Sequence, residues 1–164
     1  RVYGIDVGYG QTAWSLRTDS RVVLKERTNI RNLTHEILYG PNDPWPDFLV
    51  ADLSFISLKL VLPAMTALLK KGDRNALLLV KPQFEVGREK VSKGGVVRNV
   101  DSHVEALSGV IDSSINQGWK FKGLLPSPIT GPAGNHEYLL WLGGEFSSSK
   151  KIPDLRNLVE NTLS

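Results

Sequence analysis

Apolar and amphipathic stretches alternate along the 164 residues of the chain. The short apolar stretches are typical of buried strands, and the amphipathic ones repeat apolar residues at the three- and four-residue spacing of helices. Strands are predicted at residues 1–6, 21–26, 47–53, 75–81, 119–127 and 135–143. Helices are predicted at residues 11–17, 34–39, 57–71, 100–118 and 153–163. Strands that alternate with helices favour an α/β domain with a mainly parallel sheet.

The burial of three of these elements can be predicted in more detail. The strand at 75–81 is almost continuously apolar, which is typical of a parallel strand covered on both faces. The helix at 57–71 is expected either to begin at Pro63 or to kink there. Its predicted buried stripe consists of Leu58, Leu60, Val61, Met65, Leu68 and Leu69. The helix at 100–118 is expected to bury Leu107, Val110, Ile111 and Ile115.

Composition narrows the possible classes of protein. With 41% hydrophobic residues, the chain can form one domain with a sizeable core. It contains no cysteine, which excludes disulfides and thiolate metal sites and fits a reducing, cytoplasmic location. No apolar run approaches the roughly 20 residues that a membrane span needs, and no signal peptide is present. We expect one domain over residues 1–146, with a hinge and a C-terminal helix at 147–164 that belong to the same domain.

Charged residues stand at the ends of four predicted strands: Asp6, Glu26, Asp52 and Lys81. Ligands of open α/β sheets bind beyond the carboxyl ends of the strands, so these residues predict a cleft. Asp52 is followed by an apolar segment, so we expect its carboxylate to be partly desolvated and to need a cation. If the two strands are neighbours, Lys81 supplies that cation. The pair can be a structural salt bridge at the sheet rim or part of a catalytic site, and the spacing does not decide between them.

The last two predicted strands follow each other without a helix between them, so they are expected to pair antiparallel. Glu137 lies at the start of the second of them. If this strand runs against the others, its start lies at the edge where the other strands end, and Glu137 joins Asp52 and Lys81. His136 is expected to point to the opposite face and to be structural or exposed to solvent.

Basic residues gather in two segments, although the net charge of the whole chain is only +3. Segment 17–31 has five basic residues against two acidic ones, and segment 81–98 has the same balance. Such segments suit a polyanionic partner, or they serve only as a solubilising face. The three histidines, at positions 35, 103 and 136, are scattered, and no clustered metal ligands are found.

Several motifs resemble one known family. They are "VYGIDVGYGQTAWSLR", "ERTNIR", "ADLSFISLKLVLP", "LVKPQFEVGREKVSKGGVVRN" and "PITGPAGNHEYLLWL", and together they extend over about residues 2–143. They resemble the haemolysin TlyA family, whose members are FtsJ-like, S-adenosylmethionine-dependent ribosomal-RNA 2′-O-methyltransferases. The resemblance implies a Rossmann-like methyltransferase sheet, mostly parallel with an antiparallel last strand and lacking its N-terminal part. The family's glycine-rich cofactor loop, first catalytic lysine and N-terminal RNA-binding domain match no segment of this sequence.

The resemblance also implies roles for individual residues. Asp52, Lys81 and Glu137 match three members of the family's catalytic Lys–Asp–Lys–Glu tetrad. Asp6 matches the acid that binds the cofactor's ribose, the segment from Glu26 to Asn29 matches the adenine-side loop, and Asp52 also lies beside the cofactor. The basic residues expected to contact RNA phosphates are Arg88, Lys90, Lys93 and Arg98.

The implied reaction needs a base for the ribose 2′-hydroxyl, because the hydroxyl is a poor nucleophile until its proton leaves. Lys81 is the predicted base, oriented by Asp52 and Glu137, and no metal is needed. Phe84 can stack on a base or belong to the core. Three alternatives remain: a non-catalytic RNA-binding module with this fold, a membrane-active haemolysin, and a nicotinamide-binding Rossmann enzyme. The last lacks a complete G-x-G-x-x-G motif. The sequence does not predict an oligomeric state.

Overall fold

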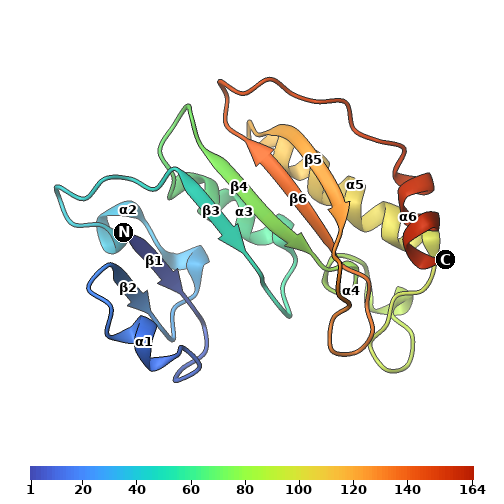
Figure 1. Ribbon diagram of the computed structural model, residues 1–164, viewed down its shortest axis with the longest axis horizontal. Helices are drawn as coiled ribbons and strands as arrows, with labels where there is room; N and C mark the ends of the chain where they lie inside the picture. Colours follow the sequence, from blue (N-terminus) through green and yellow to red (C-terminus); the bar gives the residue numbers. More distant parts are fainter. The chain divides into compact units, whose positions relative to one another are not determined.

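The computed structural model describes all residues from 1 to 164 and divides into two compact units, residues 1–43 and 44–164 (Figure 1). In the first unit, β1 (Val2–Ile5) and β2 (Val22–Lys25) form a parallel two-stranded sheet. The crossover between them contains the short helix α1 (Trp14–Arg17). The turn η1 (Ile30–Asn32) and helix α2 (His35–Leu38) complete the unit.

The second unit contains a four-stranded sheet of order β3-β4-β6-β5. Its strands are β3 (Phe48–Ala51), β4 (Asn75–Val80), β5 (Lys120–Pro126) and β6 (Tyr138–Gly143). β3 and β4 are parallel, whereas β6 runs antiparallel to both of its neighbours, β4 and β5. β6 is therefore the one reversed strand, which confirms the predicted antiparallel pair and the predicted reversal of the last strand.

The helices of the second unit pack on one face of this sheet. α3 (Leu58–Ala67) and α5 (Val100–Asn116) lie behind the strands in Figure 1, and α6 (Leu155–Leu163) packs against α5. Two short elements, α4 (Pro82–Glu85) and the turn η2 (Arg88–Lys90), follow β4 and were not predicted. The core between sheet and helices is apolar; its fully buried side chains include Leu78, Val80, Leu140, Leu142, Val61, Leu62, Met65, Leu107, Val110 and Ile111.

The structure corrects the predicted helix stripes. Leu60 is 58% exposed, because it lies about 200° around the helix from Leu58, and Leu62 is buried in its place. Ile115 is 43% exposed, and the core position at that end of α5 belongs to Ser114, whose hydroxyl donates to the Val110 carbonyl at 2.7 Å. α3 begins at Leu58, where Ser57 caps it, and Pro63 lies within the helix, which excludes the first of the two predicted alternatives, a start at Pro63.

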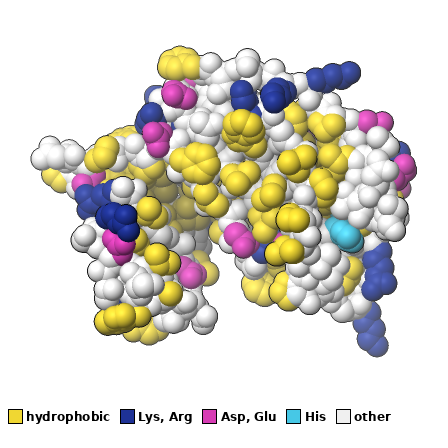
Figure 2. Space-filling view, in the orientation of Figure 1, with side chains coloured by type: hydrophobic (Ala, Val, Ile, Leu, Met, Phe, Trp, Pro, Cys, Tyr) yellow, Lys and Arg dark blue, Asp and Glu magenta, His cyan; other side chains and the backbone are white.

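The burial of β4 also differs from the prediction. Alternate residues of β4 are fully buried, but Leu77 and Leu79 are only partly buried, so full burial on both faces is not found. Figure 2 shows the face of the sheet that α3 and α5 do not cover, with apolar side chains gathered over the strands. The exposed apolar residues of the strands include Phe48, Val50, Leu125 and Trp141. No helix of the structure is long and apolar enough to cross a bilayer.

Candidate active site

Lys81 and Asp52 meet at the edge where β3 and β4 end. The two strands are parallel neighbours with Ala51 opposite Leu78, so the residues that follow them emerge at the same edge. The Lys81 Nζ lies 2.6 Å from Asp52 Oδ1 and donates to the Ser54 hydroxyl at 3.2 Å. The Lys81 side chain is only 13% exposed. The predicted facing pair is therefore present, with the amine bound to both Asp52 and Ser54 at the edge of the sheet.

The environment of Asp52 differs from the expected one. Its side chain is 66% exposed, so the prediction that it is partly desolvated is wrong. Phe55, in the apolar segment that follows, has a left-handed backbone, with φ 65°, and is 91% exposed. The Lys81 side chain is thus mostly covered, whereas its carboxylate partner remains open to water.

Glu137 reaches the same pocket from the start of β6, as the antiparallel direction of this strand predicts. Glu137 is 7% exposed, and its Oε1 accepts a hydrogen bond from Gln83 Nε2 at 3.1 Å. A Cβ atom added to Gly131 would lie 2.7 Å from the same oxygen, so glycine leaves the room that the carboxylate needs. His136 is half-buried.

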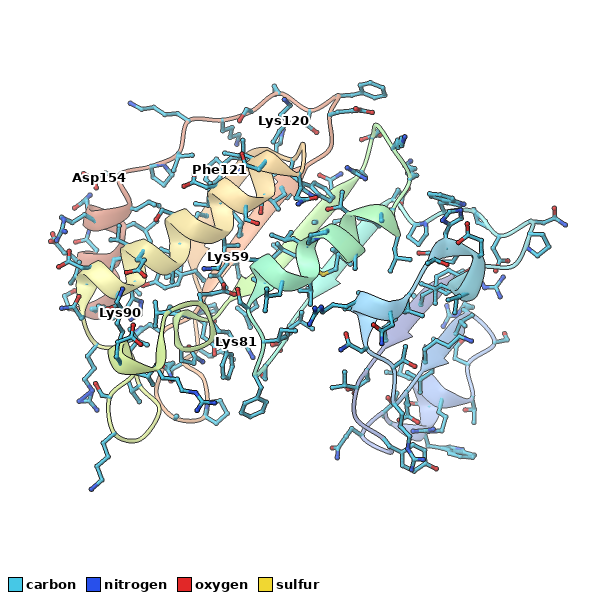
Figure 3. All side chains as sticks on the ribbon, turned by 180° about the vertical axis from the view of Figure 1, so that it is seen from behind. Lys59, Lys81, Lys90, Lys120, Phe121 and Asp154 are labelled. Atoms are coloured by element: carbon cyan, nitrogen blue, oxygen red, sulfur yellow. The ribbon has the colours of Figure 1, made fainter.

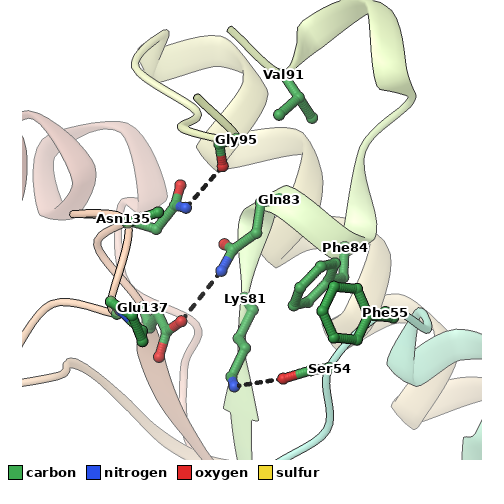
Figure 4. A pocket seen from close by; sticks show the side chains of 12 residues that line it. Ser54, Phe55, Lys81, Gln83, Phe84, Val91, Gly95, Asn135 and Glu137 are labelled. Carbon is green, nitrogen blue, oxygen red and sulfur yellow. Dashed lines mark hydrogen bonds between the residues drawn. The ribbon is translucent and has the colours of Figure 1, made fainter. Parts of the chain in front are cut away.

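A pocket of about 350 Å³ opens at this edge of the second unit (Figure 4). The residues lining it come from four segments: Ser54 and Phe55; Lys81, Gln83 and Phe84; Val91 and Gly95; and Gly131, Pro132, Ala133, Asn135 and Glu137. The Phe55 and Phe84 rings lie 5.2 Å apart at its rim. This volume lies within the usual range for small-ligand sites. Sequence reasoning missed Ser54, Phe55, Gln83 and Asn135, although each lies within the motifs that carry Asp52, Lys81 and Glu137.

Glu85, at the end of α4, is hydrogen-bonded to the start of α3 and so connects the segment after β3 with the segment after β4. It is buried and accepts hydrogen bonds from the Ser57 hydroxyl at 2.6 Å and the Leu58 N–H at 2.7 Å. Burial raises the pKa of the Glu85 carboxyl, and these two hydrogen bonds oppose that shift. The side chain therefore fixes the start of α3, which follows Asp52, to α4, which follows Lys81.

We expect Glu85→Ala to lower the free energy of unfolding by about 1–3 kcal/mol, because the Ser57 hydroxyl and the Leu58 N–H lose their acceptor. Urea denaturation of the 164-residue chain measures this loss. Glu89→Ala, which removes an exposed carboxylate, is the matched control and is expected to change stability by less than about 0.5 kcal/mol. Equal stability of the two variants would show that Glu85 does not fix this junction.

The predicted RNA-binding residues lie on the exposed segment after α4. Arg88, Lys90, Lys93 and Arg98 are all exposed, and Lys90 forms an ion pair with Glu105. Figure 3 shows Lys81 and Lys90 toward the same end of this unit, away from Lys120. Since Val91 and Gly95 of this segment line the pocket, the basic segment borders it directly.

The three predicted cofactor residues of the first unit differ in what they can still bind. Asp6 follows β1, and its Oδ1 accepts from the Gly8 N–H at 2.8 Å while Oδ2 has no protein partner. Glu26 accepts two hydrogen bonds from Arg17, at 2.7 and 2.8 Å, and one from the Gly10 N–H. Arg17 holds the pKa of Glu26 below its usual range. The Asn29 side chain caps η1 by accepting from the Arg31 N–H at 3.0 Å.

These contacts test the fit of S-adenosylmethionine. A ribose offers two hydroxyl donors, and Asp6 has a free carboxylate oxygen to accept from them. Glu26 has both oxygens engaged within the chain, so in this structure it shapes the segment around Gly10. The residues present therefore fit the cofactor, because Asp6 can accept a hydrogen bond from its ribose.

The strand order with one reversed strand, and the site at the carboxyl ends, define an α/β methyltransferase fold. A structure titled as a SAM-dependent methyltransferase from Methanosarcina mazei shares this fold, with a TM-score of 0.58 over 89% of this chain and 82% of that one at 13% identity. The family model for FtsJ-like methyltransferase matches residues 1–144. The chain belongs to the FtsJ-like methyltransferase family.

Similar proteins support this membership. The chain is 44% identical to the Mycobacterium tuberculosis protein named 16S/23S rRNA (cytidine-2′-O)-methyltransferase TlyA, over 99% of this chain and 59% of that protein. It is 46% identical to YqxC of Bacillus subtilis, provisionally named an rRNA methyltransferase, over 93% of this chain and 53% of that protein. A crystal structure of a hemolysin-like protein from Lactococcus lactis matches with a TM-score of 0.89 and 35% identity, over 99% of this chain and 76% of that one. The chain thus spans between half and two thirds of the length of these two curated relatives.

Proposed function

We propose that the protein transfers a methyl group from S-adenosylmethionine to a ribose 2′-hydroxyl of ribosomal RNA. The observation that carries this proposal is the arrangement of Lys81, whose side chain is mostly covered, beside Asp52 and in the same pocket as Glu137. The names of the two curated relatives support RNA as the substrate. A ribosomal substrate would place the protein in the cytoplasm, with ribosomal subunits as its partners.

In the proposed mechanism, the neutral Lys81 amine takes the proton of the 2′-hydroxyl as the oxygen attacks. Lys81 must first release its own extra proton, and the exposed Asp52 carboxylate at 2.6 Å offers a route for it to solvent. Glu137 orients the substrate by accepting from another of its hydrogen-bond donors, because the single proton of the 2′-hydroxyl points to Lys81. The cofactor, when bound, supplies an electrophilic methyl group on a positively charged sulfur. Holding oxygen and methyl carbon in line contributes much of the rate.

The other predicted residues would bind the two substrates. Asp6 would accept from the cofactor ribose, the segment from Glu26 to Asn29 would contact its adenine, and Asp52 would border it. Arg88, Lys90, Lys93 and Arg98 would contact RNA phosphates, which position the strand without selecting its sequence. Lys90 contributes less than the other three, because it already pairs with Glu105.

The exposed Phe55 ring is expected to stack on a base of the bound RNA together with Phe84. We expect Phe55→Ala to raise the KM for RNA about tenfold, because stacking on one base contributes roughly 1–3 kcal/mol. The KM for the cofactor should stay within twofold. Phe146→Ala removes another exposed ring, outside the pocket, and is the matched control. Steady-state methylation kinetics measure both variants, and an unchanged KM for RNA would contradict stacking at Phe55.

The function is tested with the gene's full-length product, tritiated S-adenosylmethionine and unmodified ribosomes. The expected result is tritium in a ribosomal RNA, in dinucleotides that survive alkaline hydrolysis, because a 2′-O-methyl group blocks cleavage at that position. Calorimetric titration with S-adenosylmethionine separates the main alternative: a non-catalytic RNA-binding module would neither label RNA nor need to bind the cofactor. Binding of RNA without either signal would favour that alternative.

A further inference from the structure

We propose that Gln83 and Asn135 are positioning residues that hold the Glu137 carboxylate toward the reacting ribose. This inference rests on the proposed methyl transfer, in which Glu137 touches the substrate. The two amides act at different places. Gln83 contacts the carboxylate itself, and Asn135 fixes the loop that leads to it (Figure 4).

Gln83 contacts the carboxylate from the segment that also carries Lys81. Its Nε2 donates to Glu137 Oε1, and the carboxylate, which only accepts, sets the orientation of the amide. The Oε1 of Gln83 is buried and has no hydrogen-bond partner. A buried acceptor without a partner costs about 1–3 kcal/mol, which an apolar side chain of the same shape would avoid. An amide at position 83 is therefore unfavourable for the stability of the fold. What the amide provides in return is the hydrogen bond to Glu137.

Asn135 fixes the backbone two residues before Glu137. It is 2% exposed, its Oδ1 accepts from the Val97 N–H at 3.0 Å, and its Nδ2 donates to the Gly95 carbonyl at 2.8 Å. Its own carbonyl accepts from the Gly131 N–H at 2.9 Å, which closes the turn beside the carboxylate. One buried side chain thus joins the turn before β6 to the glycine-rich end of the basic segment.

The residue after Glu137 is anchored to the same strip of backbone. The Tyr138 hydroxyl contacts Nδ1 of His103 at 2.9 Å, and Nε2 of His103 contacts the Val97 carbonyl at 3.0 Å. Both polar groups of Val97 are therefore held by side chains, one through Asn135 and one through His103. Glu137 lies between these two anchors, and Gln83 sets the direction of its carboxylate.

Loss of either amide should leave substrate binding intact and slow the chemical step. A misplacement of about 1 Å in a catalytic group can cost about 10²-fold in rate. We expect Gln83→Leu and Asn135→Asp to lower kcat by about 10- to 100-fold, with the KM for RNA and for cofactor within twofold. Asn135→Asp keeps the acceptor for Val97, but it replaces the donor to Gly95 by a carboxylate oxygen that faces the Gly95 carbonyl. Gln117→Leu is the matched control, because it makes the same glutamine-to-leucine change at the end of α5, outside the pocket.

The deciding test is a double-mutant cycle with Glu137→Gln in the full-length gene product, acting on unmodified ribosomes. If Gln83 acts through Glu137, adding Gln83→Leu to Glu137→Gln causes little further loss of kcat, and the same holds for Asn135→Asp. Losses that multiply, or losses in KM instead of kcat, would overturn the inference while leaving the methyltransferase function in place. A parent protein that does not methylate RNA would overturn both. Thermal unfolding of each variant excludes simple loss of the folded state.

Discussion

Lys81→Met is expected to lower the rate of ribose methylation by about 10²–10⁴-fold, the range found for removal of a general base. Methionine fills a similar volume but cannot take a proton, and the Lys81 side chain is only 13% exposed, so water has little access to replace it. The affinity for S-adenosylmethionine should remain within twofold. Single-turnover methylation of unmodified ribosomes and calorimetric titration of the cofactor measure the two quantities separately.

Lys81→Arg distinguishes a base from a mere positive charge. Arginine keeps the pairing with Asp52 at the sheet edge but does not lose its proton in proteins, so we expect it to be as slow as methionine. Lys150→Met, which removes an exposed lysine far along the chain from the pocket, serves as the control. An active Lys81→Arg enzyme would show that the residue acts only through its charge and that the proposed base is wrong.

His103→Leu is expected to lower the free energy of unfolding by roughly 2–5 kcal/mol. His103 and Tyr138 are both fully buried, and the ring nitrogens of His103 contact the Tyr138 hydroxyl and the Val97 carbonyl. Leucine would leave the Val97 carbonyl buried without its side-chain partner, at a cost of about 1–3 kcal/mol. It would also remove one hydrogen bond of the Tyr138 hydroxyl, at about 0.5–1.5 kcal/mol, while the one with Thr162 remains. Urea denaturation at pH 7.5 measures the difference between the two proteins.

The same residue predicts how stability depends on pH. Burial lowers the pKa of His103 below its usual value of about 6.5, against the opposing effect of the Val97 carbonyl. The Val97 carbonyl only accepts, so Nε2 carries the proton and the neutral Nδ1 accepts from the Tyr138 hydroxyl. As pH falls below about 6.5, the unfolded chain takes up a proton at this site before the folded chain does, and stability decreases.

Comparison of the two proteins isolates this effect. Between pH 7.5 and 5.5 the parent should lose more stability than His103→Leu, because the variant lacks the titrating group while all other groups are unchanged. Parallel stability curves over this range would contradict a lowered pKa for His103. In that case the whole effect of the substitution would come from the lost hydrogen bonds.

Local patterns predicted the elements and one contact of the site. The six strands and five of the six α-helices follow from apolar spacing, and the reversal of β6 follows from the missing helix between the last two strands. The pairing of Asp52 with Lys81 follows from one rule, that parallel neighbours end at the same edge. Such features depend on residues close in sequence or on the direction of a strand, so one chain is enough to predict them.

Predictions that needed the exact environment of a side chain were less successful. An apolar segment after Asp52 predicted neither the exposure of its carboxylate nor the left-handed backbone at Phe55. Leu60 and Ile115 were placed in the core because they are apolar, but burial depends on the phase of the helix against the sheet. The division into units of residues 1–43 and 44–164 was not predicted, and the single domain over 1–146 stays a prediction.

The sequence by itself determined the order of the elements, the family, and the three charged residues Asp52, Lys81 and Glu137 at strand termini, because each of these depends on local composition. Only the tertiary structure decided that Gln83 and Asn135 belong with them. These two amides act through hydrogen bonds to residues 54 and 38 positions away along the chain. Hydrogen bonds between residues so far apart in the sequence produce no periodic pattern in it. They exist only where the folded chain brings donor and acceptor within about 3 Å.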